Sequence, residues 1–352
     1  MKRLLTLTML AFLIGKTHAQ VSFGHAELLN DDWRFLLADS TLNVAESPGM
    51  KDAGYDDSRW RRVTLPHDWS VEQPMSPDKG SCQGYLPGGV AWYRKTLSDK
   101  SLVLSEEEKS ANAKRSTLNK TFVYFEGVYN HSEVYLNGHL LGKRPSGFAS
   151  FLYDLTPWLK NDGSDVLAVR VDHSQEADSR WYTGSGIYRN VWLVSAPDVH
   201  LALWGTAYRL KSINDSKAIV EVDVETTDEG LQTTDYRLQT SDLRLQALVE
   251  LMDAEGNVVA KTTTAIGTQE KKTVKLTVRN PKRWTLDNPY LYTLRTILLP
   301  PTTLNLQPDT SVVRAGLRTL QFSPTKGFAL NGEWMKVKGV CVHDDAGVLG
   351  TA

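Results

Sequence analysis

Two stretches of the sequence combine residue types that recognise polar substrates. Residues 180–189 hold two arginines, three aromatic rings and two glycines, and His343, Asp344 and Asp345 follow a strongly apolar segment. Cationic side chains donate hydrogen bonds, carboxylates accept them, and aromatic rings pack against apolar faces. Both stretches are therefore candidates for substrate contact.

Carboxylates also stand beside tryptophan three times, in residues 31–33, 55–60 and 65–69. A sugar site is one interpretation, and the other is that tryptophan fills a core while aspartate caps turns. We favour the structural interpretation for the first two motifs. In the third, His67 and Asp68 are similar to part of a catalytic dyad. Because the sequence has no G-x-S-x-G nucleophile elbow, a structural loop is favoured again.

The other candidates leave alternatives open. For residues 180–189, a functional rim or inter-domain contact and a purely structural corner agree equally well with the chemistry. For His343, substrate contact is favoured over a structural turn if the preceding segment is a barrel strand, because that end of barrel strands carries substrate-binding residues. One histidine with two adjacent acids cannot form a facial metal cluster alone, so no metal site is predicted.

Composition excludes several classes of protein. The 352 residues carry 40 lysines and arginines against 41 acids, a formal net charge of −1, so a nucleic-acid-binding surface is not expected. Glycine (25), proline (14) and cysteine (2) are too few for a collagen-like, disordered or disulfide-scaffold chain. Cys82 and Cys341 have no local spacing motif, which favours two unpaired thiols over a disulfide.

The N-terminus predicts export. Lys2 and Arg3 precede an apolar run over residues 4–14, which is the layout of a secretory signal peptide cleaved after Ala19. Cleavage removes these two cations and Lys16 but no acid, which changes the net charge from −1 to −4. Neither this run nor any other segment is long and apolar enough to span a membrane. We therefore expect a periplasmic or extracellular protein.

Short alternating segments dominate the rest of the chain, so we predict an all-β fold. Residues 122–128, 165–172 (with one apolar face) and 191–194 are predicted strands, and Asn137-Gly138 supplies the positive φ of a tight hairpin turn. Residues 218–295 hold a second series, typical of an immunoglobulin-like sandwich. A further hairpin, at Asn331-Gly332, leads into an apolar strand predicted over residues 336–342.

A series of short motifs, in order along the chain, resembles glycoside hydrolase family 2, in particular its bacterial β-galactosidase-like members. The motifs are YDDSRW (55–60), LPHDW (65–69), WYRK (92–95), FEGV (125–128), YLNG (135–138), SRWY (179–182), GSGIYR (184–189), NPYLY (288–292), GLR (316–318), LNG (330–332) and KGV (338–340). Together they cover nearly the whole chain after the signal peptide.

The resemblance implies a domain order. It begins with the signal peptide (1–19) and a jelly-roll, galactose-binding-like sandwich (20–197). An immunoglobulin-like sandwich (198–318) follows, and then the first strand of an incomplete catalytic (β/α)₈ barrel (319–352). Family members are retaining glycosidases whose acid/base and nucleophile glutamates stand about 5–5.5 Å apart. Both lie on later barrel strands and are expected beyond residue 352, so this chain is predicted to be inactive alone.

The resemblance also carries over four substrate contacts. His343 matches a sugar-contacting histidine after the first barrel strand, and Arg180 and Trp181 match a first-domain loop that reaches the barrel mouth. Asp178, three positions before Trp181, is the fourth, although relatives place an acid two positions before that tryptophan. Asp344 stands where many relatives have a second histidine.

The sequence therefore predicts the N-terminal part of an exported retaining exo-glycosidase that acts on terminal β-linked sugars. β-Galactoside is favoured over β-glucuronide and β-mannoside. The alternative is a stand-alone carbohydrate-binding module built from the two sandwiches. The expected partner is a carbohydrate, with no nucleic acid and no membrane span. No cofactor is predicted for this chain. For the full-length enzyme, a structural or active-site cation and a homo-oligomer stay open.

Overall fold

The computed structural model of the chain describes residues 21–38, 46–97, 119–160, 162–175, 179–227, 245–301, 308–341 and 350–352. The predicted signal peptide, Asp178 and His343 lie outside these residues. The helices described are short and of the 3-10 type: η1 (Pro48–Lys51), η2 (Ser70–Glu72), η3 (Ser81–Gln83) and η5 (Thr156–Trp158). None of the helices in this part of the chain is long and apolar enough to cross a membrane.

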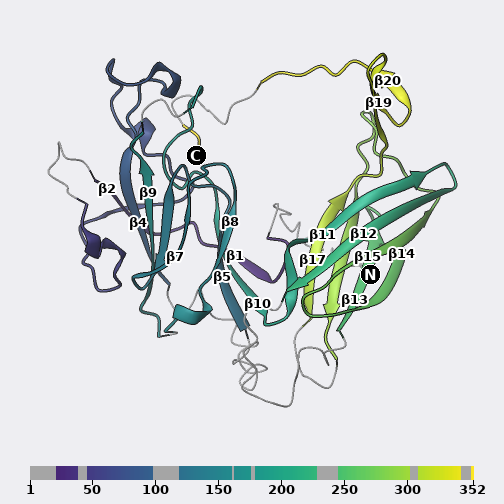
Figure 1. Cartoon of the computed structure of the whole chain (residues 1–352), viewed down its shortest axis with the longest axis horizontal. Coiled ribbons are helices and arrows are strands. Elements are labelled where there is room, and N and C mark those ends of the chain that lie inside the picture. Colours follow the sequence, from purple (N-terminus) through teal and green to yellow (C-terminus); the bar gives the residue numbers. More distant parts are fainter. Residues whose placement is uncertain are drawn as a thin grey trace, which may run out of the picture.

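Two antiparallel sheets form the first sandwich (Figure 1). One, in the order β1-β10-β5-β8, contains β1 (His25–Leu28), β10 (Val191–Pro197), β5 (Asn119–Phe125) and β8 (Phe151–Asp154). The other, in the order β3-β2-β4-β9-β6-β7, contains β3 (Arg61–Val63), β2 (Trp33–Ala38), β4 (Gly89–Leu97), β9 (Asp165–His173), β6 (Ser132–Leu136) and β7 (His139–Arg144). Side chains of both sheets meet in one core, which confirms the predicted sandwich.

The predicted hairpin joins β6 to β7. Asn137 and Gly138 have φ angles of 52° and 88°, the positive values that a tight two-residue turn requires. The Asn137 side chain also holds the turn against β9, because it donates to Asp165 Oδ1 (2.6 Å) and accepts from the Val166 amide (3.0 Å). The predicted turn is confirmed, and the Asn137 side chain also anchors it to β9.

Strand β9 is more deeply buried than its alternating sequence predicted. One exposed face was expected, yet residues 165–169 are all buried. The outer face is covered because the segment before β3 folds over it, so that Met50 and Trp60 pack with Trp92 and Ala168 in a separate small core. A strand with apolar layers on both faces loses the alternation of exposure that its sequence suggests.

A second sandwich follows. Its three-stranded sheet, in the order β11-β12-β15, contains β11 (His200–Ile213), β12 (Lys217–Thr227) and β15 (Lys271–Arg279). Its four-stranded sheet, in the order β14-β13-β16-β17, contains β14 (Val258–Ile266), β13 (Leu245–Met252), β16 (Tyr292–Leu299) and β17 (Asp309–Ala315). Three strands facing four is the arrangement of an immunoglobulin-like domain, as predicted.

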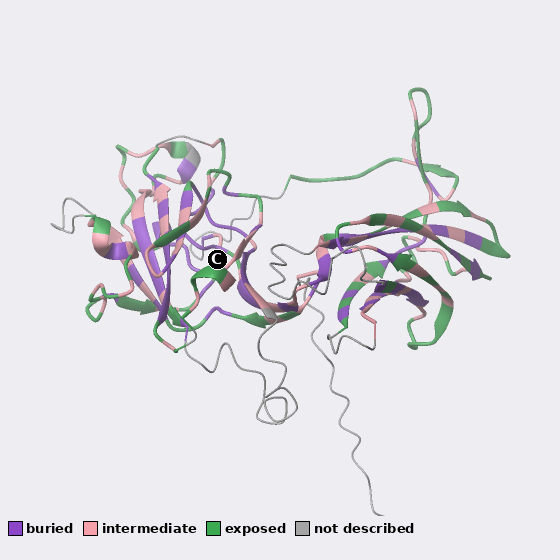
Figure 2. Cartoon of the chain, turned by 60° about the horizontal axis from the view of Figure 1, so that its bottom comes forward, coloured by how far each residue is buried: buried purple, intermediate pink, exposed green. Residues whose placement is uncertain are grey.

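The core of the second sandwich continues into the first, and buried segments meet at the junction in Figure 2. Phe23 lies edge-on to Phe122 of β5, with ring centroids 5.5 Å apart, and stacks on His200 at the start of β11 at 4.6 Å. Asp309 adds polar contacts, because its carboxylate accepts the amides of Gly24 (2.7 Å) and Leu201 (2.8 Å). The two sandwiches are therefore joined by packing as well as by the chain.

A small three-stranded sheet, in the order β18-β19-β20, ends the regular structure and contains β18 (Leu320–Ser323), β19 (Gly327–Leu330) and β20 (Glu333–Met335). The predicted Asn331-Gly332 turn joins β19 to β20. The apolar strand predicted next is not formed over residues 336–341, where Val337 and Val340 are 73% and 87% exposed. The reason is that no described strand pairs with this segment, which runs toward the first sandwich (Figure 1).

Candidate functional site

The segment 180–189 divides into an exposed and a buried half. Arg180 and Trp181 are exposed, the latter by 38%, whereas residues 183–188 are buried. Residues 183–188 form a structural corner, and the exposed Arg180 and Trp181 form a rim above it, whose predicted contact with substrate stays a prediction. Of the four predicted contacts, the structure places these two together, and Asp178 and His343 fall outside the described residues.

Asp68 holds the buried half in place. The side chain is 3% exposed, and its Oδ1 accepts the amides of Ser70 (3.0 Å) and Ser185 (2.9 Å). Its Oδ2 accepts the Tyr182 hydroxyl (2.6 Å) and both the amide (3.0 Å) and hydroxyl (3.2 Å) of Thr351. Backbone pairing adds to this, since the His67 amide donates to Ile187 O at 2.8 Å. The loop after β3 thus fixes the corner below the rim.

A chain of side-chain hydrogen bonds runs below Asp68. The hydroxyls of Ser70 and Ser185 lie 2.6 Å apart, and Ser185 Oγ lies 2.6 Å from Nδ1 of His173 at the end of β9. The His173 Nε2 in turn lies 3.2 Å from Gln83 Nε2 in η3. These residues are buried, so the network is sheltered from water and adds rigidity to the corner.

His67 sits in a buried hydrogen-bond network. Its Nδ1 lies 2.7 Å from the Tyr93 hydroxyl, and its Nε2 lies 3.2 Å from both Arg61 and Glu72. Burial lowers the pKa of His67 despite the nearby Glu72. Burial alone raises the pKa of Glu72, but the hydrogen bond from Arg61 and the charges of His67 and Arg61 outweigh it, so that pKa is lowered. The predicted structural role of this loop is confirmed.

This network makes the fold sensitive to mild acid. A neutral imidazole in the folded state, with a pKa below its ordinary value of 6.5, means that the unfolded chain binds more protons as pH falls through 6.5. We expect the melting temperature to drop from pH 7.5 to pH 5.5, and the drop to be smaller in His67→Gln. The exposed His25→Gln is the matched control. Equal pH dependence of His67→Gln and the unmutated protein in thermal melts would contradict this.

Phe148 extends the rim, and sequence reasoning missed it. Its ring is 57% exposed, lies 6.4 Å from the Trp181 ring, and meets the buried Tyr129 ring edge-on at 5.3 Å. The carbonyl before it, that of Gly147, accepts the hydroxyl of buried Tyr188 at 2.8 Å. An exposed aromatic pair on a backbone held from below is a preformed surface for an apolar face. The sequence offered only an aromatic after a Ser-Gly turn as a signal.

The other tryptophans of the acidic motifs are buried. Trp33, Trp60 and Trp69 are 0%, 6% and 0% exposed, so they fill cores. The structural interpretation of the first two motifs is confirmed, and the third shares it. Within the described residues, no group of three or more His, Cys, Asp or Glu side chains is placed to hold a metal ion. Cys341 is an unpaired, exposed thiol.

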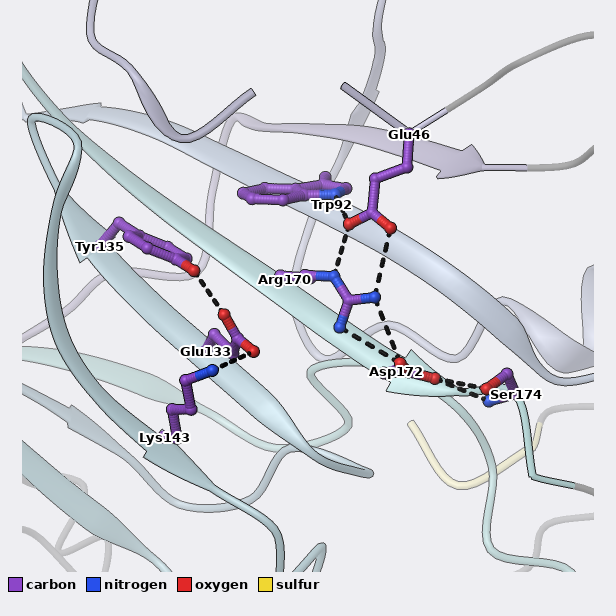
Figure 3. Close-up of polar contacts among 8 residues, drawn as sticks. All are labelled: Glu46, Trp92, Glu133, Tyr135, Lys143, Arg170, Asp172 and Ser174. Carbon is purple, nitrogen blue, oxygen red and sulfur yellow. Dashed lines mark hydrogen bonds and ion pairs between the residues drawn. The ribbon is translucent and has the colours of Figure 1, made fainter. Parts of the chain in front are cut away.

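Charged residues also gather on the outer face of the six-stranded sheet (Figure 3). Glu46 accepts hydrogen bonds from Arg170 and, at 3.0 Å, from Trp92 Nε1. Glu133 accepts from Lys143 (2.7 Å) and from the Tyr135 hydroxyl. These bonds outweigh the effect of burial and lower the pKa of Glu133, while burial and Glu133 raise that of Tyr135 to about 12. A glycosidase acid needs a raised pKa, so Glu133 does not suit that role.

Two family models match the chain. The model of the sugar binding domain of glycosyl hydrolases family 2 matches residues 26–197, and the model named glycosyl hydrolases family 2 matches residues 203–318. The chain belongs to glycosyl hydrolase family 2. The first match covers the sandwich that carries the rim and Asp68, and the second covers most of the immunoglobulin-like sandwich.

Relatives of this family 2 chain are longer proteins. It is 40% identical over 330 residues to Beta-galactosidase BoGH2A of Bacteroides ovatus, with 92% of this chain and 35% of that protein covered. It is 27% identical over 337 residues to a Beta-glucuronidase of Formosa agariphila, with 88% and 31% covered. The crystal structure of a beta-glycosidase from Bacteroides vulgatus superposes with a TM-score of 0.77 at 33% identity, with 93% and 38% covered. The chain spans about a third of the length of these curated relatives.

Proposed function

We propose that Arg180, Trp181 and Phe148 contact a terminal β-linked sugar in a family 2 glycosidase, with β-galactoside as the first candidate. The observation that carries the proposal is the exposed Trp181 ring beside the exposed Phe148 ring, on a corner held by buried hydrogen bonds. Because the two rings are held before a ligand arrives, little conformational entropy is lost when a pyranose face packs on them.

β-Galactoside is favoured because the relative with 40% identity is named a β-galactosidase. β-Glucuronide is the second candidate, since the exposed Arg180 guanidinium suits a sugar carboxylate, and another relative is named a β-glucuronidase. In this proposal the described residues bind and orient the sugar. Glu46 and Glu133, whose carboxylates are held by hydrogen bonds, take no part in hydrolysis.

A sugar titration of the 352-residue chain tests the proposal. Methyl β-galactoside is added while binding is followed by calorimetry or NMR shifts. We expect millimolar binding, and Trp181→Ala should weaken it about twofold to twelvefold, the effect of losing one aromatic contact of about 0.5–1.5 kcal/mol. The control is Trp204→Ala, which removes a 61% exposed tryptophan from β11 of the second sandwich.

Two outcomes would contradict the proposal: no binding up to tens of millimolar sugar, or equal weakening by Trp181→Ala and Trp204→Ala. The choice of sugar is decided in the same titration. If methyl β-glucuronide binds more tightly than the galactoside and Arg180→Met abolishes that preference, the substrate is the charged sugar.

A further inference from the structure

Asp68 contacts parts of the chain that are far apart in the sequence. Its carboxylate accepts hydrogen bonds from Ser185 and Tyr182, more than a hundred positions away, and from Thr351, 283 positions away. Backbone and side-chain donors both point at it, and the carboxylate is 3% exposed. A buried carboxylate with this many donors is stabilised by charge-assisted hydrogen bonds, which are stronger than neutral ones.

We propose that Asp68 is a positioning residue that couples the rim loop to the segment around Thr351. Oδ2 is shared between the two, since the Tyr182 hydroxyl (2.6 Å) and the Thr351 amide (3.0 Å) donate to the same atom. Tyr182 directly follows Trp181, so the contact fixes the base of the exposed ring. Loss of either donor therefore changes the hydrogen bonding of the oxygen that holds the other.

The backbone around Asp68 is built for this close approach. Gly184 has a φ of +69°, and a Cβ on it would lie 2.0 Å from Thr351 Oγ1 and 2.6 Å from Asp68 Oδ2. Gly350 has a φ of +70°, and a Cβ on it would lie 2.4 Å from Asp68 Oδ2. Side chains at either position would push Thr351 away from the carboxylate. The lack of space for a Cβ at both positions is evidence for the close approach that does not depend on the hydrogen bonds.

The coupling would help to position the proposed sugar site. Thr351 is held beside Tyr182, which directly follows Trp181, the residue proposed to contact the sugar. Asp68 makes no contact with sugar in this scheme and acts only by fixing the two segments relative to one another. This positioning role rests on the proposed function, whereas the anchor itself does not.

The test measures both segments in one protein. The amide exchange rate of Thr351 is read by NMR on threonine-labelled chain, with its signal assigned through Thr351→Ser. The Trp181 environment is read by fluorine NMR on fluorotryptophan-labelled chain, with its signal assigned through Trp181→Phe. In Asp68→Asn we expect Thr351 exchange to accelerate about tenfold or more, because an amide NH₂ replaces one acceptor, and the Trp181 signal to shift.

A deletion and a matched control separate positioning from folding. Removing residues 350–352 deletes no strand of either sandwich and should still shift the Trp181 signal. Asp309→Asn alters another carboxylate that is 3% exposed and accepts backbone amides, and it should change neither readout. An unshifted Trp181 signal in the deletion, or Thr351 exchange that Asp68→Asn leaves unchanged, would overturn the coupling. If the chain binds no sugar although Asp68→Asn changes both Thr351 exchange and the Trp181 signal, the result would count against the proposed function alone.

Discussion

Replacing Arg94 with methionine is expected to reduce the free energy of unfolding by about 3–5 kcal/mol, the cost of breaking a buried ion pair. Arg94 on β4 is 1% exposed, and its guanidinium donates to Asp57 (2.8 Å) and to the carbonyls of Met50 (2.6 Å) and Asp52 (3.0 Å). Methionine fills much of the volume but removes the donors that Arg94 supplies to these three acceptors. Met50, Asp52 and Asp57 belong to the segment that covers the outer face of β9.

Denaturant unfolding of the chain measures this effect. The matched control is Arg62→Met, because Arg62 pairs with Asp32 at 2.8 Å but both side chains are more than half exposed. Exposed pairs of this kind contribute about 0–1 kcal/mol. If Arg94→Met costs no more than the control, then the segment before β3 is held by Trp60 and Met50 packing and not by the arginine.

Gly186→Ala is expected to destabilise the fold by about 2–5 kcal/mol, from backbone strain and overpacking together. Gly186 has a φ of +124°, which L side chains rarely adopt. A Cβ there would lie 2.3 Å from the Tyr93 hydroxyl and 2.7 Å from the His67 carbonyl oxygen. The residue also exchanges two backbone hydrogen bonds of 2.9 Å with Tyr129, so it cannot move without breaking them.

The same unfolding measurement applies, with Gly54→Ala as the control. No atom outside its chain neighbours lies within 4 Å of a Cβ built at Gly54, so that change should stay within about 0.5 kcal/mol. Because Gly186 lies in the corner below the rim, Gly186→Ala should also weaken sugar binding where the protein remains folded. A stability equal to that of Gly54→Ala would show that the corner relaxes more easily than its contacts suggest.

Local patterns predicted most of the strands. An apolar run marked β5, alternation marked β10, and Asn-Gly marked both hairpin turns, because each signal depends only on neighbouring residues. The burial of β9 on both faces was not predictable, since it depends on a segment about a hundred positions earlier folding over Ala168. The strand expected over residues 336–342 failed for a related reason, because pairing depends on a neighbour that no local pattern supplies.

The candidate site, too, was predicted only in part. Arg180 and Trp181 were found through a family resemblance, and their exposure agrees with a rim. Phe148 was missed because the exposure of an aromatic residue depends on packing that sequence does not display. The contact of Asp68 with Thr351 joins positions 283 apart, so it follows only from the complete fold.

Because the core is continuous at the junction, the second sandwich depends on the first for part of its core, but the first does not depend on the second. The first has a core made only of its own side chains, whereas the core of the second takes in Phe23, Phe122, Tyr124, Trp192 and Val194 from the first. During synthesis the N-terminal sandwich emerges earlier, and N-terminal units generally fold first. It can therefore fold before the second sandwich is synthesised and then present the apolar outer face of β5 and β10, on which the second core packs. The sandwich that is synthesised first is therefore the one whose core does not depend on the other.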